Sequence, residues 1–229
     1  MDELDNIKDK FEKASEKNQL LLVDEIITKG EKGYQFLRDF LVSTADVSPI
    51  RGKIYQVLRN SNTEENDRFL RDKFPEGLVE LVSEKNIEYR ELQQLLVERK
   101  YQEADSLTRE KLCELAGEGA VRRKWVYFTE VKKFPVADLK TIDTLWYVYS
   151  EGKFGYKIQR QIWLSLGKDY NQLWVKLKWK KGNKWTKYPG EFIWDLSAPP
   201  GHLPLSNQLR GVRFIDALFS HPAWENKSK

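Results

Sequence analysis

The sequence predicts an all-α fold, and two observations indicate it. Apolar residues recur at spacings of three and four along most of the chain, and glycine or proline follows where these periodic stretches end. The 229 residues, 40% of them hydrophobic and 32% charged, supply enough apolar material for a packed core. We therefore expect helices packed into one large domain or two small ones.

The first part of the chain is expected to form a bundle of short helices. Ser15 is placed to cap a helix that runs to Ile27, and Gly30 follows as a left-handed stop. Further helices are expected over 34–41, 54–58 and 63–74. A faint similarity at an offset of 21 residues relates 34–38 to 55–59, which arises either by chance or from stacked helical repeats.

The second part is expected to hold more helices and two long connections. The periodic stretches cover 89–99, 101–116, 138–149, 154–166, 169–177 and 207–219. The segments 120–135 and 178–204 are expected to be irregular, and the first of them carries aromatic rings among lysines and arginines. Rings in such a segment need a partner, either the core or a ligand.

Charge and tryptophan are distributed unevenly, which predicts two domains. Residues 1–80 contain 13 Lys and Arg against 17 Asp and Glu, whereas the rest contains 26 against 18, and all eight tryptophans follow residue 80. Phe74-Pro75-Glu76-Gly77 would end the last helix of the first part. We expect an N-terminal helical bundle at 1–80 and a second domain at 87–229.

Composition excludes several classes of protein. The longest aliphatic run, 20–23, is far below the roughly 18 residues of a membrane-spanning helix, and no targeting segment is visible. The single cysteine, Cys113, fits a buried hydrophobe, and His202 fits a turn residue bonded to backbone better than an axial metal ligand. No catalytic motif is present, so no enzyme is expected.

The expected last helix combines a core stripe with a cationic face. At 100° per residue, Asn207, Arg210 and Arg213 share one face with Phe214. Two guanidinium groups, an amide and a ring suit a flat apolar ligand with acidic edges. An exposed face balanced by surface carboxylates explains the same pattern, and so does a scaffold that contacts an acidic protein.

The segment 174–188 contains six lysines, three tryptophans and no acidic residue. Lysine interleaved with aromatic rings is typical of grooves that bind single-stranded nucleic acid. The alternative is a solubilised loop over a tryptophan core.

Three groups of residues, in order and spacing, resemble the genomes-uncoupled-four family of tetrapyrrole-binding regulators of magnesium chelatase. The groups are Glu103-Ala104-Asp105-x-x-Thr108-Arg109-x-x-Leu112, then Leu145-Trp146-x-x-Tyr149-Ser150-x-Gly152-x-Phe154-Gly155-Tyr156-x-x-Gln159, then Gly201-His202-Leu203-Pro204 with Asn207-Gln208-Leu209-Arg210-Gly211-Val212-Arg213. The resemblance covers about 89–224. The first 80 residues are more loosely similar to the helical extension of the cyanobacterial and plastid-encoded members.

The resemblance implies an all-helical domain shaped like a cupped hand, with long loops, that binds protoporphyrin IX and Mg-protoporphyrin IX without chemistry. It implies no obligatory cofactor or metal, and it extends the ligands to bilins. The ligand-contacting positions of the family fall here on Phe128, Val131, Tyr188, Asn207, Arg210 and Arg213. Several members carry tryptophan where this chain has Tyr188, which implies weaker stacking there.

The resemblance also implies a partner, the large porphyrin-binding subunit of magnesium chelatase, whose metal insertion the family stimulates in chlorophyll biosynthesis. A monomer that associates peripherally with membranes is expected, with no nucleic acid as partner. The expected compartment is the cytoplasm of a cyanobacterium or the plastid stroma.

Overall fold

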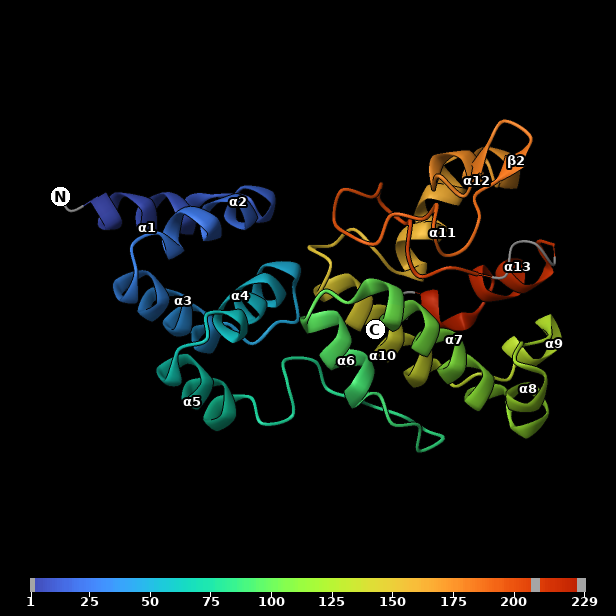
Figure 1. The fold of residues 1–229 in the computed structure, drawn as a ribbon, viewed down its shortest axis with the longest axis horizontal. Coiled ribbons are helices and arrows are strands. Elements are labelled where there is room, and N and C mark those ends of the chain that lie inside the picture. The colour runs from blue at the N-terminus through green and yellow to red at the C-terminus, as the bar shows by residue number, and fades with distance from the viewer. Residues whose placement is uncertain (1–2, 207–210, 226–229) are drawn as a thin grey trace. The chain divides into compact units, whose positions relative to one another are not determined.

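The computed structural model describes residues 3–206 and 211–225, and most of them lie in helices (Figure 1). The expected all-α class is therefore confirmed. The chain divides into two compact units, the first formed by Met1–Glu80 with Val148–Gly152 and the second by Leu81–Tyr147 with Lys153–Lys229. The segment Val148–Gly152 belongs to the first unit, although it follows the change in composition near residue 80.

Five helices make up the described part of the first unit: α1 (Glu3–Lys13), α2 (Glu16–Ile27), α3 (Glu31–Ser43), α4 (Pro49–Asn60) and α5 (Glu64–Lys73). The four expected helices correspond to α2 to α5, whereas α1 was not expected. Its buried residues Leu4, Ile7 and Phe11 are spaced for one helical face. Phe11 meets two rings of α3 edge to face, Phe36 at 5.5 Å and Phe40 at 5.0 Å.

The first unit also buries charged side chains, each with polar partners. Arg38 is 4% exposed and forms ion pairs with Glu31 and Glu65. Lys53 donates hydrogen bonds to the Leu20 carbonyl and to the Asp24 carboxylate, both at 2.7 Å. The pair of Arg38 with Glu65 joins α3 to α5, and the contacts of Lys53 join α4 to α2. Leaving either buried charge unpaired would cost several kcal/mol.

Gly52 on α4 approaches Val148 closely, so we predict a large effect of Gly52→Ala. A Cβ there would lie 2.2 Å from the Val148 carbonyl oxygen, and backbone cannot yield as a flexible side chain does. The variant should lose at least about 2 kcal/mol of unfolding free energy in the first unit. Urea unfolding followed by far-UV circular dichroism measures it. Gly190→Ala is the control, because nothing lies within 4 Å of its Cβ position; equal losses would contradict the packing.

The second unit begins with α6 (Arg90–Val97) and α7 (Tyr101–Ala116), as expected, and Gly117 ends α7 with a positive φ of 102°. The prediction that 120–135 is irregular is wrong in part, because α8 (Glu118–Arg123) and α9 (Phe128–Val131) lie there. These helices are only six and four residues long, too short for a periodic pattern to reveal them. Helix α10 (Val136–Val148) follows.

The remaining elements of the second unit are α11 (Tyr156–Ser165), α12 (Tyr170–Lys176) and α13 (Arg213–Phe219), followed by a 3₁₀ turn at Pro222–Trp224. A two-residue hairpin, β1 (Lys180–Lys181) and β2 (Lys184–Trp185), interrupts the otherwise irregular segment after α12. The prediction of one helix over 207–219 is wrong about where the helix begins. Gly211 adopts a φ of 90°, which is incompatible with a helix, so α13 begins at Arg213.

Tryptophan forms much of the core of the second unit. Trp174 and Trp179 stack at 5.4 Å with an angle of 12°, and they are 3% and 0% exposed. The third tryptophan of this segment, Trp185, is half-buried with the Lys180 ammonium 5.4 Å from its ring. The segment 174–188 is thus a lysine-bearing loop over a tryptophan core, the second of the two interpretations of its composition.

None of the helices among residues 3–206 and 211–225 is both long and apolar enough to cross a bilayer.

Candidate functional site

Helices α9 and α13 pack together and bring two of the predicted ligand contacts side by side. The Arg213 guanidinium lies over the ring of Phe128, 5.5 Å from its centroid. Phe128 is half-buried, and Arg213 is exposed at the first residue of α13. A cation above an aromatic ring that is still partly open to solvent offers both an apolar wall and a charged edge.

Val131, one turn after Phe128 on α9, is fully buried. A ligand would reach it only after α9 or a neighbouring segment shifted, so its role stays a prediction. Asn207 and Arg210 lie outside the described residues, and their predicted contacts also stay predictions.

Helix α9 is held in place by Arg123 and Glu130. The carboxylate of Glu130 forms an ion pair with Arg123 and accepts the Tyr127 N–H at 2.8 Å, which caps α9. The Arg123 guanidinium also lies 4.2 Å from the Tyr127 ring centroid and 5.2 Å from that of Trp125. The rings of this segment therefore have partners: Arg123 for Trp125 and Tyr127, and Arg213 for Phe128.

Tyr188 is 45% exposed and has neighbours of its own. Its hydroxyl accepts a hydrogen bond of 2.8 Å from Arg109 on α7, whose guanidinium lies 4.7 Å from the ring centroid. The Trp194 ring meets Tyr188 edge to face at 5.7 Å. Tyr188 is thus a further ring paired with a guanidinium, built on different elements from the Phe128 pair.

Sequence reasoning missed four residues that shape these two places: Asp105, Arg109, Arg123 and Glu130. Asp105 and Arg109 are one turn apart on α7, and their ion-pair distance of 3.4 Å is the contact that such spacing favours. Arg123 and Glu130 lie on separate short helices, and nothing in their spacing predicts their contact.

His202 is fixed by backbone at both ring nitrogens. Nδ1 lies 2.6 Å from the Leu177 carbonyl oxygen, to which it donates, and Nε2 accepts the Ile193 N–H at 3.1 Å. Burial lowers the pKa of His202, so the ring is neutral near pH 7. The expectation of a turn histidine bonded to backbone is confirmed. Cys113 is 7% exposed, in agreement with a buried hydrophobe.

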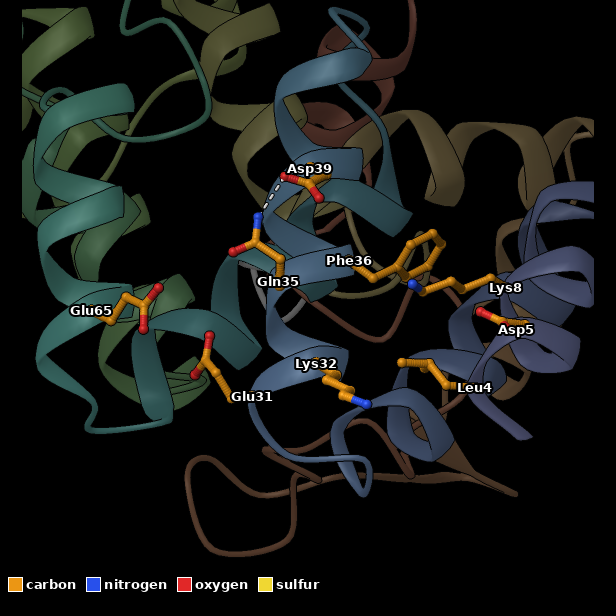
Figure 2. A pocket seen from close by; sticks show the side chains of 9 residues that line it. All are labelled: Leu4, Asp5, Lys8, Glu31, Lys32, Gln35, Phe36, Asp39 and Glu65. Atoms are coloured by element: carbon orange, nitrogen blue, oxygen red, sulfur yellow. Dashed lines mark hydrogen bonds between the residues drawn. The ribbon is translucent and has the colours of Figure 1, made fainter. Parts of the chain in front are cut away.

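A cavity of about 490 Å³ lies in the first unit and contains none of the predicted site residues (Figure 2). Leu4, Phe36 and Gln35 line it together with six charged side chains: Asp5, Lys8, Glu31, Lys32, Asp39 and Glu65. Gln35 donates a hydrogen bond of 2.7 Å to Asp39 across its wall. Sites for flat apolar ligands have mostly apolar walls, and this cavity does not.

Known proteins match both units. Residues 82–222 match the family model described as GUN4-like, and residues 1–75 match the ARM-like repeat domain, GUN4-N terminal. The second match favours repeats over chance as the origin of the similarity between 34–38 and 55–59.

Individual relatives agree with the family match. The chain is 46% identical to a Ycf53-like protein of Synechocystis sp., covering 97% of both chains. It is 42% identical to an Arabidopsis thaliana protein named tetrapyrrole-binding protein, chloroplastic, covering 58% of this chain and 54% of that one. The solved structure of GUN4 from Chlamydomonas reinhardtii superposes with a TM-score of 0.60 at 42% identity, covering 64% of this chain and 96% of that one. The chain therefore belongs to the GUN4 family, in its cyanobacterial and plastid type.

Proposed function

We propose that the second unit binds a tetrapyrrole, protoporphyrin IX or Mg-protoporphyrin IX, and leaves it chemically unchanged. The observation that carries the proposal is the Arg213 guanidinium over the half-buried ring of Phe128. The 42% identical Arabidopsis relative, which is named a tetrapyrrole-binding protein, supports it.

The chemistry of a porphyrin fits this arrangement. The ligand is an apolar disc with two propionates on one edge, so it needs aromatic walls and a cationic rim. Burying ~400 Å² of the disc at ~25 cal/mol per Å² contributes about 10 kcal/mol, and association costs at least ~4 kcal/mol. The difference of at most about 6 kcal/mol corresponds to a dissociation constant of tens of micromolar. Exposed ion pairs contribute about 1 kcal/mol or less each, so Arg210 and Arg213 orient the propionates more than they hold the disc.

A titration with protoporphyrin IX tests the proposal. Binding should red-shift and sharpen the Soret band and quench tryptophan fluorescence, because all eight tryptophans lie within 125–224. Parallel titrations with Mg-protoporphyrin IX and a bilin rank the ligands. An unchanged spectrum at protein concentrations up to about 100 μM, above the expected dissociation constant, would exclude the function.

The proposal extends to a partner, the large porphyrin-binding subunit of magnesium chelatase, whose metal insertion the bound protein would stimulate. Stimulation in a reconstituted chelatase assay, lost when the second unit cannot bind porphyrin, would support this step. The proposed compartment is a cyanobacterial cytoplasm or a plastid stroma, in keeping with relatives from Synechocystis and from a chloroplast. A monomeric state and peripheral membrane association remain parts of the same proposal, to be measured by sedimentation and by flotation with vesicles.

Single-stranded nucleic acid is the competing ligand. A groove that stacks bases needs exposed rings, and two of the three tryptophans in 174–188 are buried. Strand binding that falls steeply with salt, in a protein that ignores porphyrin, would favour it instead.

A further inference from the structure

Asp105 on α7 is a buried carboxylate with two unlike partners. Its side chain is fully buried. Oδ1 accepts the Leu205 N–H at 2.6 Å, and Oδ2 lies 3.4 Å from Nε of Arg109. One carboxylate therefore contacts a backbone group 100 residues away and a guanidinium one helical turn away.

The two partners of Asp105 connect it to different parts of the candidate site, Arg109 to Tyr188 and Leu205 to the segment before α13. The Arg109 side chain is 43% exposed, and it donates to the Tyr188 hydroxyl while its guanidinium lies against the Tyr188 ring. Leu205 lies two positions before Asn207, in the segment that leads to α13 and Arg213. Gln159 on α11 holds the same segment, since its Nε2 donates to the carbonyls of Gly201 and Pro204 at 3.0 and 2.7 Å.

The surroundings of Asp105 make its charge sensitive to pH near neutrality. Burial raises the pKa of Asp105 to about 7, against the lowering effects of Arg109 and of the Leu205 N–H. Tyr156 on α11 is the other titratable group that interacts with Asp105, and Asp143 on α10 acts on Tyr156. Burial, and then the charges of Asp105 and Asp143, raise the pKa of Tyr156, so its phenol is neutral. Burial also raises the pKa of Asp143, to about 6.

We propose that Asp105 is a positioning residue of the tetrapyrrole site. Its negative charge holds the Arg109 guanidinium against the Tyr188 ring, while its Oδ1 fixes the segment before Asn207 by accepting the Leu205 N–H. The inference rests on the proposed function. When Asp105 is neutral, Arg109 loses its counter-charge. Its guanidinium then no longer fixes the orientation of Tyr188.

The sign of the pH effect follows. Above pH 7 Asp105 is ionised and both contacts are in place, and as the pH falls through about 7 the proton binds and ligand affinity falls. Stability moves in the opposite direction. A carboxyl whose folded pKa exceeds its unfolded value of about 3.9 favours folding below that value, and this contribution is lost as the pH rises through the folded pKa.

Asp105→Asn tests the proposal, with Asp143→Asn as the matched control. Asparagine keeps an oxygen that can accept the Leu205 N–H but offers Arg109 no charge. Asp143 is also a buried aspartate that accepts a backbone N–H, that of Lys157 at 2.9 Å, and its described partners include neither Arg109 nor Leu205.

We expect Asp105→Asn to raise the dissociation constant for protoporphyrin IX about tenfold at pH 8, the scale of a lost charged contact. Its affinity should then vary less between about pH 6 and pH 8 than that of the wild type. Asp143→Asn should bind within about twofold of the wild type and keep its pH profile. Because ligand propionates titrate equally in all three proteins, the difference between profiles isolates Asp105.

Two further measurements keep the proposal falsifiable. Arg109→Gln should reproduce both the weaker binding and the flatter profile, and the double variant should be no weaker than either single one. Without ligand, Asp105→Asn should speed hydrogen exchange of the amides in 186–194 and 203–206, and Asp143→Asn should not.

The outcomes separate the two proposals. Wild-type affinity and pH profile in a folded Asp105→Asn protein would overturn the positioning role, and so would unchanged exchange in both segments. If the wild type fails to bind porphyrin, the proposed function fails, and the exchange measurement alone still decides whether Asp105 holds the two segments.

Discussion

Replacing Phe128 with alanine is expected to raise the dissociation constant for protoporphyrin IX by roughly 10- to 100-fold, whereas Arg213→Ala raises it by about fivefold or less. The ring of Phe128 is half-buried and supplies apolar contact, while Arg213 is exposed and its ion pair with a propionate would be screened by water. Soret titrations of the two variants under identical conditions give the ranking.

The matched control is Val175→Ala, which removes an apolar side chain that is 55% exposed on α12 and should leave the affinity unchanged. Tryptophan fluorescence melts show whether each variant is folded. If Arg213→Ala proves the more damaging change, then the charge at the ligand edge dominates binding and disc burial does not.

The second large effect is expected on stability. Trp179→Ala should lower the unfolding free energy of the second unit by about 3–5 kcal/mol, because the ring is fully buried, stacks on Trp174 and donates from Nε1 to the His202 carbonyl at 2.8 Å. Trp185→Ala, at a half-buried position in the same segment, should cost less than about 1.5 kcal/mol.

Urea unfolding followed by tryptophan emission measures the second unit alone, because the first unit contains no tryptophan. Equal losses in the two variants would contradict the tryptophan core. A Trp179→Ala protein of unchanged stability that no longer binds single-stranded nucleic acid would instead revive the competing function.

Much of the helical architecture could be predicted because the periodic stretches are long. The expected 101–116 coincides with α7, and both Thr63 and Asp169 cap their helices, with side chains that accept backbone N–H groups. Helices α8 and α9 could not be predicted, since they depend on the ion pair of Arg123 with Glu130 and on packing, of α8 on α7 and of α9 on α13, rather than on a sequence pattern.

The candidate site could be predicted only in part. The resemblance led to Phe128 and Arg213, which the structure brings together, and to Tyr188, which it places against Arg109. A helical wheel drawn through 207–219 could not give the geometry, because Gly211 has a φ of 90° and α13 begins only at Arg213. The sequence could not predict the positioning role of Asp105 either, since that role depends on its contact with Leu205, 100 positions away, and only folding brings the two together.

The return of Val148–Gly152 to the first unit bears on how this molecule can be divided. In that loop Tyr149 is fully buried, with its ring 6.2 Å from that of Tyr55, and its carbonyl accepts a hydrogen bond from Gln56. Cleavage after residue 80 would leave this loop on the C-terminal fragment, without the helices against which it packs. The Tyr149 ring would then be exposed to solvent, and its carbonyl would lose the hydrogen bond from Gln56. A C-terminal fragment prepared this way should self-associate, and restoring the N-terminal piece in trans should disperse it.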